Sequence, residues 1–294
     1  MVKSINNEAY LTAELVDPIE KTKPYLSGDE FDATMNYNFS FLVHDFFVQD
    51  AKGSSVTQFD KQLKELREGF GQGVAINMQN LVGSHDATRI GSAVANPDGK
   101  KFGDWGDYFT WSQKSNNVGY NARKPTAKQL EKQKLIAAFQ ILYLGSPMIY
   151  YGDECGMWGS NDPDCRKPMV WTDKNYDAET FNPDQSIHEA DMVKFNSDLF
   201  NWYKKFIGLR NQYKAVKLGG YTTIETNDLE KTYAFSRKLG NEEVIVIINR
   251  SDKAVLFANP ILNKGNYKEV FTKKAMKKVT LKPMDVVVLS NSIH

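Results

Sequence analysis

Short apolar runs alternate with amphipathic stretches over the first two thirds of the chain. Apolar residues recur at helical spacing over 57–68 and 126–144, and the aromatic-rich stretch 192–213 has the same periodicity. Short β-prone runs separate these stretches, and each ends in small or polar residues: 9–13, 31–37, 74–81 and 148–151. Strands that alternate with helices predict a parallel sheet with right-handed crossovers, so this part of the chain is predicted to be α/β.

The pattern changes after about residue 217. Short strands separated by turns are predicted there, without a helical periodicity: 221–225, 232–237, 243–249, 254–257, 267–271 and 286–289. Such a run predicts a small antiparallel β domain. We therefore expect an α/β unit over residues 1–214 and an antiparallel β-sandwich over residues 215–294.

Two long insertions interrupt the α/β unit, at 96–124 and 158–188. Both follow the C-terminal ends of predicted strands, where long loops carry function. Four tryptophans lie in or beside them: Trp105, Trp111, Trp158 and Trp171. Indole faces stack on sugar rings, so these residues could line a carbohydrate cleft, although loop packing is the more frequent role for any one of them.

The composition narrows the classes of function. Apolar residues make up 41% of the chain and aromatics 12%, which is enough for a substantial core. The 37 Lys and Arg nearly balance the 36 Asp and Glu and form no basic stripe, so nucleic acid is not a predicted partner. No run of about 18 apolar residues predicts a membrane span. The two cysteines, Cys155 and Cys165, are expected to be free thiols rather than one local bridge.

Polar groups follow two of the predicted strands. His85 and Asp86 lie side by side in a small-residue turn after 74–81, and Glu14 follows 9–13. Barrels of parallel strands and helices build active sites from side chains at the C-terminal ends of the strands. From the residues alone, Glu14 could be a general acid or a surface glutamate, and the His-Asp pair could be catalytic or structural.

The second insertion carries further charged residues. Asp162 and Arg166 could grip sugar hydroxyls together, or could form a salt bridge with each other. Arg89 is interpreted as a structural salt-bridge partner. The adjacent carboxylates Asp153 and Glu154 have no metal-ligand spacing with any histidine, so neither a catalytic metal nor a cofactor is predicted.

Taken together, these residues resemble glycoside hydrolase family 13, the α-amylase family, and within it the neopullulanase, cyclomaltodextrinase and maltogenic amylase group. The resemblance covers nearly the whole chain and rests on segments similar to the family's fifth, sixth, seventh and eighth strand motifs and its substrate-gripping loop: 13–16, 31–37, 80–89, 145–154 and 162–171. The fifth-strand motif is the weakest, because Ala13 replaces the usual glycine and Val16 the usual aromatic residue. The resemblance implies the C-terminal half of a (β/α)8 TIM barrel, strands five to eight, followed by a small antiparallel all-β domain.

The resemblance also implies a role for each candidate residue. Glu14 would be the acid/base, and Asp86 would strengthen its hydrogen bonds to the sugar as the transition state forms. His85 would contact the sugar in the −1 position, and Asp162 and Arg166 would bind the next sugar. The family retains anomeric configuration, so the implied activity is hydrolysis of α-1,4-linked and also α-1,6-linked glucans such as maltodextrins, cyclodextrins or pullulan.

The family's nucleophile, an Asp that ends the fourth strand, has no counterpart here, since none of the residues before Glu14 is Asp or Arg. We therefore expect Met1 to be an internal methionine and the chain to be a fragment that is nearly inactive alone. Open edges at the fifth and eighth strands predict self-association or a complementing half-barrel chain. The alternative hypotheses are a non-catalytic glucan-binding module and one half of a split amylase. The compartment, cytoplasm or periplasm, stays open.

Overall fold

The computed structural model describes residues 2–98 and 105–292 of the chain. Four short strands of its first part pair in parallel: β1 (Thr12–Ala13), β2 (Ala33–Thr34), β3 (Gln79–Asn80) and β4 (Ser146–Pro147). β1 pairs in parallel with β2, and β3 pairs in parallel with β4. A parallel bridge between Met35 and Gln79 joins the two pairs. The predicted parallel pairing is therefore confirmed.

The strand prediction over 74–81 is wrong at its start. Gly71, with a φ of +79°, ends helix α4 (Val56–Phe70), and a further helical turn, α5 (Gln72–Ala75), begins directly after it. The Ala75 N–H donates to the Gly71 carbonyl, so the turn satisfies its own backbone. The first apolar residues of this run, Val74 and Ala75, therefore belong to a helical turn, and the strand itself begins only at Gln79.

Two further strand boundaries differ from the prediction. The run 31–37 does not stay extended to its end, because the Asn36 side chain accepts a hydrogen bond from the Phe39 N–H and caps helix α3 (Tyr37–Val43). The fourth strand lies at 146–147 rather than 148–151. Only the Met148 N–H, which donates to the Asn80 carbonyl, extends its pairing toward the predicted range.

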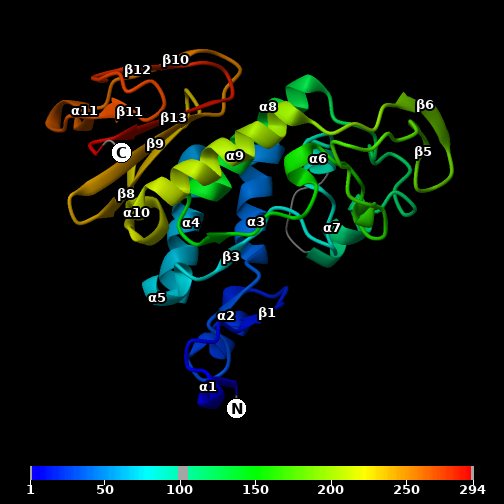
Figure 1. Cartoon of the computed structure of the whole chain (residues 1–294), viewed down its shortest axis with the longest axis horizontal. Coiled ribbons are helices and arrows are strands. Elements are labelled where there is room, and N and C mark those ends of the chain that lie inside the picture. The colour runs from blue at the N-terminus through cyan, green and yellow to red at the C-terminus, as the bar shows by residue number, and fades with distance from the viewer. Residues whose placement is uncertain (1, 99–104, 293–294) are drawn as a thin grey trace.

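The long helices form where their periodicity predicts them. α4 is confirmed, and α8 (Ala127–Leu142) begins after Thr126, whose side chain forms a capping box with Gln129. α9 (Ser197–Gln212) starts later than predicted, because Asn196 accepts a hydrogen bond from the Leu199 N–H and caps it. α8 and α9 pack against each other across the middle of the molecule (Figure 1).

Short helices and one hairpin fill the connections. The remaining helices are α1 (Val2–Ile5), α2 (Ile19–Thr22), α6 (Ile90–Ala93), α7 (Trp105–Ser112), α10 (Lys214–Leu218), a π-helix (His44–Val48) and three 3₁₀ helices (Lys23–Leu26, Asp153–Cys155 and Asp164–Arg166). The second insertion forms the hairpin of β5 (Glu179–Phe181) and β6 (Ile187–Asp191), which projects at the right of Figure 1.

The C-terminal part is a five-stranded sheet in the order β11-β13-β9-β8-β7, with a separate antiparallel pair of β10 and β12. Its strands are β7 (Gly220–Asn227), β8 (Thr232–Leu239), β9 (Glu242–Asn249), β10 (Val255–Phe257), β11 (Lys268–Glu269), β12 (Val279–Leu281) and β13 (Asp285–Ser290). The antiparallel prediction is confirmed. The prediction overlooked β12, and it was wrong to exclude a helix, because α11 (Ile261–Lys264) forms one turn there.

One core joins the sheet to the helices. The ring of Phe59 in α4 stacks on Phe46 with 4.1 Å between centroids, and it lies 5.5 Å from Phe139 of α8 and 5.8 Å from Tyr233 of β8. The Tyr233 hydroxyl donates to Asp60 of α4 at 2.7 Å. The sheet therefore packs directly on α4 and α8, and α8 also packs against β4 of the parallel strands.

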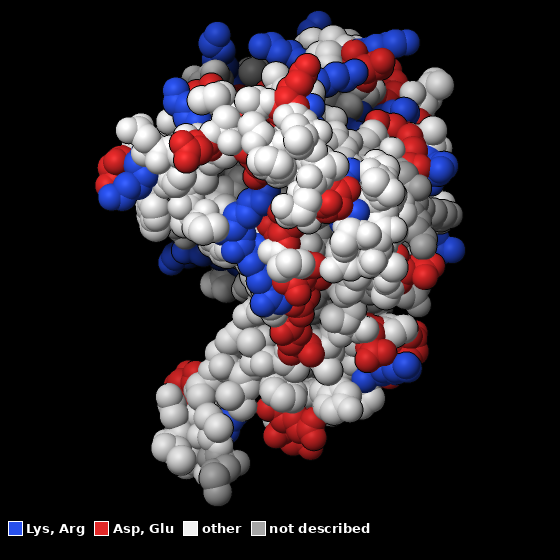
Figure 2. Space-filling model, turned by 90° about the vertical axis from the view of Figure 1, so that its right-hand side faces the viewer, with Lys and Arg blue, Asp and Glu red and all other residues white. Residues whose placement is uncertain are grey.

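The surface and the cysteines agree with the composition. Acidic and basic side chains lie among each other on the face shown in Figure 2. Among the described residues, no helix combines the length and the apolar character that crossing a bilayer requires. Cys155 and Cys165 are free and buried, and burial raises the pKa values of their thiols to about 12 and about 11.

Candidate active site

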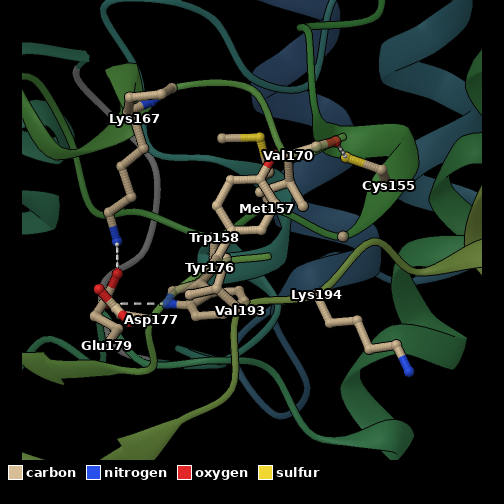
Figure 3. A pocket seen from close by; sticks show the side chains of 12 residues that line it. Cys155, Met157, Trp158, Lys167, Val170, Tyr176, Asp177, Glu179, Val193 and Lys194 are labelled. Carbon is tan, nitrogen blue, oxygen red and sulfur yellow. Dashed lines mark hydrogen bonds and ion pairs between the residues drawn. The ribbon is translucent and has the colours of Figure 1, made fainter. Parts of the chain in front are cut away.

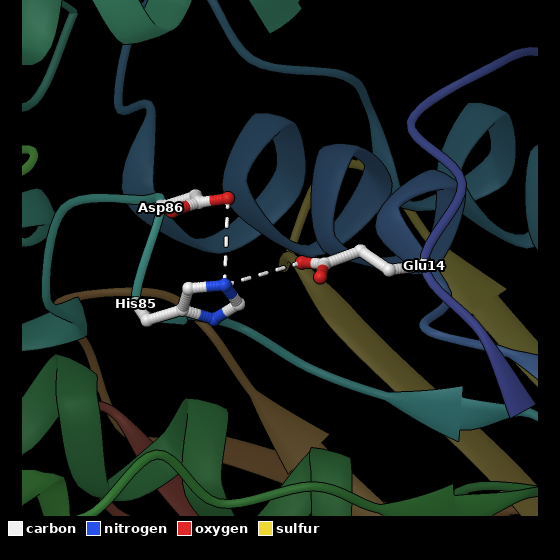
Figure 4. Close-up of side chains that lie close together, drawn as sticks. All are labelled: Glu14, His85 and Asp86. Atoms are coloured by element: carbon white, nitrogen blue, oxygen red, sulfur yellow. Dashed lines mark ion pairs between the residues drawn. The ribbon is translucent and has the colours of Figure 1, made fainter.

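Three candidate side chains from distant parts of the sequence meet at one edge of the parallel strands (Figure 4). Glu14 directly follows β1, and His85 and Asp86 lie in the turn after β3. His85 Nε2 lies 3.7 Å from Glu14 Oε1 and 3.5 Å from Asp86 Oδ2. The C-terminal ends of parallel strands meet at the same edge of a sheet, which explains the convergence. The side chains are between 39% and 47% exposed, so a ligand can reach them.

The other two candidates reach the same place from the second insertion. Arg166 Nη2 donates to Asp86 Oδ1 at 2.8 Å, and Arg166 Nε donates to the His85 carbonyl at 2.9 Å. The same guanidinium pairs with Asp162 Oδ1 at 2.6 Å. Asp162 and Arg166 thus form the salt bridge that was one of the two alternatives, and their role toward a sugar stays a prediction. Arg166 connects the substrate-loop candidate Asp162 to the candidate carboxylate Asp86.

Two residues that the sequence analysis did not select also touch the site. The Tyr37 hydroxyl donates to Glu14 Oε1 at 3.0 Å and lies 3.2 Å from Ser84 Oγ. Ser84 Oγ in turn accepts the Asp86 N–H at 3.1 Å. Burial raises the pKa of Tyr37, so the hydroxyl keeps its proton. The sequence signal that could have found Tyr37 is the helix cap at Asn36, because it places Tyr37 at the start of α3. The sequence pattern predicts a strand over 31–37 instead.

A buried ion pair braces the turns that follow β3 and β4. Arg89 Nη1 lies 3.2 Å from Asp153 Oδ1 and donates to the Tyr151 carbonyl at 2.6 Å. The guanidinium lies over the rings of Tyr150 and Tyr151, at 4.6 and 4.7 Å from their centroids. Burial raises the pKa of Asp153 to about 7, and the charge of Arg89 opposes that rise. This agrees with the structural role predicted for Arg89.

A hollow in and beside the second insertion is shown in Figure 3. It has a volume of about 250 Å³ and an apolar lining that includes Met157, Val170 and Trp158. Trp158 is buried, and its Nε1 donates to Glu179 Oε1 at 3.1 Å, while Glu179 also pairs with Lys167 at 2.7 Å. This indole is therefore part of the framework rather than an open stacking surface.

Of the other tryptophans in the two insertions, one is packed in a loop and one is exposed. Trp111 packs edge-on against Tyr120 at 5.1 Å, which is loop packing. Trp171 is 56% exposed and keeps its indole accessible. The side chain of Trp105 lies outside the described residues. The structure therefore offers Trp171, and not Trp158, as an accessible aromatic surface.

The cluster combines two carboxylates with one imidazole, which suits proton transfer and hydrogen bonding to hydroxyls. One ligand atom from each of Glu14, His85 and Asp86 lies within 4.8 Å of the others, so the three could also surround a cation. Partly exposed carboxylates often approach one another without an ion. The expectation that the site needs no metal and no cofactor stays a prediction.

Comparison with known proteins identifies the family. The family described as the catalytic domain of alpha amylase matches residues 1–105 and 116–219. The chain belongs to the α-amylase family. The family described as the C-terminal domain of maltogenic amylase matches residues 221–288. The resemblance on which the sequence analysis relied is thereby confirmed.

Individual relatives agree with this assignment. A cyclomaltodextrinase of Geobacillus thermopakistaniensis (strain MAS1) is 30% identical over 266 residues, which cover 90% of this chain and 36% of the relative. Neopullulanase 2 of Thermoactinomyces vulgaris is 29% identical over 299 residues, which cover 99% of this chain and 42% of the relative. The α-amylase-family chain thus spans well under half the length of these curated relatives.

Solved structures show the same fold. A cyclomaltodextrinase structure superposes with a TM-score of 0.71 at 25% identity, over 98% of this chain and 41% of the other. A cyclic α-maltosyl-(1→6)-maltose hydrolase from Arthrobacter globiformis superposes with a TM-score of 0.68, over 99% of this chain and 51% of the other. At 24% identity, the second likeness supports the fold alone. The chain therefore has the amylase-family fold, with a catalytic domain and a C-terminal all-β domain.

Proposed function

We propose that this chain carries the acid/base part of a retaining hydrolase for α-1,4-linked, and also α-1,6-linked, glucans. The observation that carries the proposal is the convergence of Glu14, His85 and Asp86, with His85 Nε2 at 3.7 and 3.5 Å from the two carboxylates. Glu14 protonates the glycosidic oxygen and later activates water. Asp86 and His85 bind the sugar in the −1 position, where Asp86 stabilises the oxocarbenium-like transition state.

Arg166 and Asp162 extend the site toward the next sugar. Both groups can bind vicinal hydroxyls with two parallel hydrogen bonds, a geometry that suits a pyranose ring. Their ion pair at 2.6 Å holds the guanidinium over Asp86, which it contacts at 2.8 Å. The substrates that follow from this reading are maltodextrins, cyclodextrins or pullulan.

The four parallel strands correspond in this proposal to strands five to eight of a (β/α)8 barrel. Residues 1–214 form this half-barrel, and residues 215–294 form the β-sandwich domain. Support comes from the strand order, in which, among the described residues, β1 pairs only with β2 and β4 only with β3. Both outer edges can accept a further parallel strand, from a complementing half-barrel chain or from a second copy.

Retention needs a second carboxylate about 5–5.5 Å from the acid, which attacks the anomeric carbon. The family places that Asp upstream of the acid/base, and no residue of this sequence before Glu14 is an Asp. We therefore propose that a polypeptide of these 294 residues is nearly inactive alone. A complementing segment with the nucleophile would restore turnover, because this chain would supply the other groups of the proposed site.

A glucan-binding module without catalysis is the alternative. The contact of the Tyr37 hydroxyl with Glu14 Oε1, at 3.0 Å, favours catalysis, because a binding module needs no oriented carboxyl at this position. Asp86 is likewise held from two sides, by Arg166 and by its own backbone bond to Ser84.

The experiment measures glucan binding and turnover separately. Calorimetry with maltoheptaose and β-cyclodextrin tests binding to the 294-residue chain. Release of reducing ends is then measured with the chain alone and after addition of a separately expressed segment with strands one to four of a cyclomaltodextrinase. Glu14→Gln should lower the complemented rate at least about 100-fold while binding persists, since general acid catalysis contributes roughly 10²–10⁴-fold. Glu20→Gln, at an exposed glutamate in the nearby α2, is the matched control.

Three possible results distinguish the hydrolase from the glucan-binding module. Complemented turnover that depends on Glu14 and not on Glu20 supports the hydrolase. Binding without any complemented turnover supports the glucan-binding module. No binding of either glucan at millimolar concentration, by a chain that unfolds cooperatively, refutes both readings.

A further inference from the structure

Tyr37 joins the proposed acid/base to the turn that carries the sugar-binding pair. Its hydroxyl donates to Glu14 Oε1 at 3.0 Å and contacts Ser84 Oγ at 3.2 Å. Ser84 Oγ also accepts the Asp86 N–H at 3.1 Å. The relay therefore runs from the Glu14 carboxyl through two hydroxyls to the backbone of Asp86, and it spans three separate segments of the chain.

The tyrosine is held rigidly, whereas the carboxyl it contacts is not. Tyr37 is 1% exposed, and its ring packs in a small apolar cluster with Met35, Leu81 and Tyr108. It is also the first residue of α3, whose start is fixed by the Asn36 cap. Glu14, in contrast, has a side chain 39% exposed and follows a two-residue strand. A partly exposed glutamate at such a strand end samples several rotamers unless a fixed partner selects one.

The hydroxyl is suited to hold a carboxyl that must release and regain a proton. Burial raises the pKa of Tyr37, so its O–H remains a donor at neutral pH. The contact with Ser84 Oγ, at 3.2 Å, holds the hydroxyl from its other side.

We propose that Tyr37 is a positioning residue that orients the Glu14 carboxyl for proton delivery, an inference that rests on the proposed function. With Oε1 occupied by the Tyr37 hydroxyl, the acidic proton lies on Oε2. Glu14 then gives the Oε2 proton to the glycosidic oxygen as the bond to the anomeric carbon breaks, and it takes a proton from water through the same oxygen. Ser84 fixes the hydroxyl from its other side and couples its position to the Asp86 backbone.

The test compares two tyrosines that each donate to a carboxylate. Tyr37→Phe removes the hydroxyl at the site. Tyr233→Phe is the matched control, because Tyr233 is equally buried and donates to Asp60 Oδ1 at 2.7 Å in the remote core. Both variants, in the full chain labelled with glutamate enriched in ¹³C at the side-chain carboxyl, are examined by NMR. The Glu14 signal is assigned by its loss in Glu14→Gln.

We expect Tyr37→Phe to shift the Glu14 carboxyl signal by more than its line width and Tyr233→Phe to leave it in place. Maltoheptaose should shift the same signal in the wild-type chain. In the complemented enzyme, Tyr37→Phe should lower kcat for maltoheptaose about 10-fold with little change in KM, as expected from losing one hydrogen bond to a charged group. Turnover of α-maltosyl fluoride should persist, because fluoride leaves without a proton.

The possible results distinguish failure of the positioning role from failure of the proposed function. An unchanged Glu14 signal in Tyr37→Phe, with a melting temperature lowered as in Tyr233→Phe, overturns the positioning role and leaves the proposed function standing. If maltoheptaose does not shift the Glu14 signal of the wild-type chain, the proposed function is overturned, and the positioning role with it. If Tyr37→Phe does not fold, Ser84→Ala replaces it, because this variant keeps the tyrosine ring. A shifted Glu14 signal in Ser84→Ala supports the positioning role, and an unshifted signal overturns it.

Discussion

Replacement of Arg89 by methionine should strongly destabilise the chain. Arg89 is fully buried, and its guanidinium lies over the adjacent rings of Tyr150 and Tyr151. It donates to the Tyr151 carbonyl at 2.6 Å and pairs with Asp153 Oδ1 at 3.2 Å. Arg89→Met keeps an apolar side chain over the rings and removes the charge and the donors.

The magnitude follows from what the substitution leaves behind. Asp153 is 1% exposed, so Arg89→Met leaves a buried carboxyl without its ion-pair partner and also removes the donor to the Tyr151 carbonyl. Breaking a buried pair by removing one partner destabilises a protein by about 3–5 kcal/mol. We expect a loss of that size in the free energy of unfolding at pH 8, where the wild-type carboxyl is ionised.

The loss should depend on pH with a definite sign. Burial raises the pKa of Asp153 from 3.8 to about 7, against the charge of Arg89. A carboxyl whose folded-state pKa lies above its unfolded value contributes stability that is present at low pH and lost as the pH rises through the folded value. Arg89→Met removes the opposing charge, so its effect should be smallest near pH 5 and largest above about pH 7.

Urea unfolding followed by tryptophan fluorescence at pH 5 and pH 8 measures both quantities. The double variant Arg89→Met/Asp153→Leu should recover most of the stability, because an apolar pair can replace a buried ion pair. Lys21→Met, which removes an exposed pair with Asp17 at 3.3 Å, is the control and should leave the midpoint unchanged. A loss below about 1 kcal/mol at pH 8, or losses that simply add in the double variant, would refute the reasoning.

Three further predictions concern the helices, the core and the site. Thr126→Ala should lower the free energy of unfolding by about 1 kcal/mol in urea titrations, since it removes the cap of α8. Phe59→Ala should lower it by about 3–5 kcal/mol, because the ring is fully buried and stacks on Phe46 at 4.1 Å. Arg166→Gln should weaken maltoheptaose binding roughly 10-fold in calorimetry, because it removes the ion pair that holds Asp86. Both side chains are about half exposed, so the melting temperature should stay unchanged.

Helices were predicted better than strands, for a local reason. The cap of α8 lies in residues three apart, Thr126 and Gln129, so neighbouring side chains decide where the helix starts. Each parallel strand is only two residues long, which is too short for an alternating pattern to appear. The run 74–81 shows the consequence, because most of its apolar residues precede the strand: α5 ends at Ala75, and the strand itself consists of Gln79 and Asn80.

The sequence by itself determined which chemical groups are present and that Glu14, His85 and Asp86 follow strands. It also determined the family, through motifs whose residues lie next to one another. Only the tertiary structure decided that Tyr37 contacts Glu14 and that Arg166 contacts Asp86, across separations of 23 and 80 residues. Contacts of this kind depend on how α3 and the second insertion pack against the strand ends, and no local spacing in the sequence records that packing.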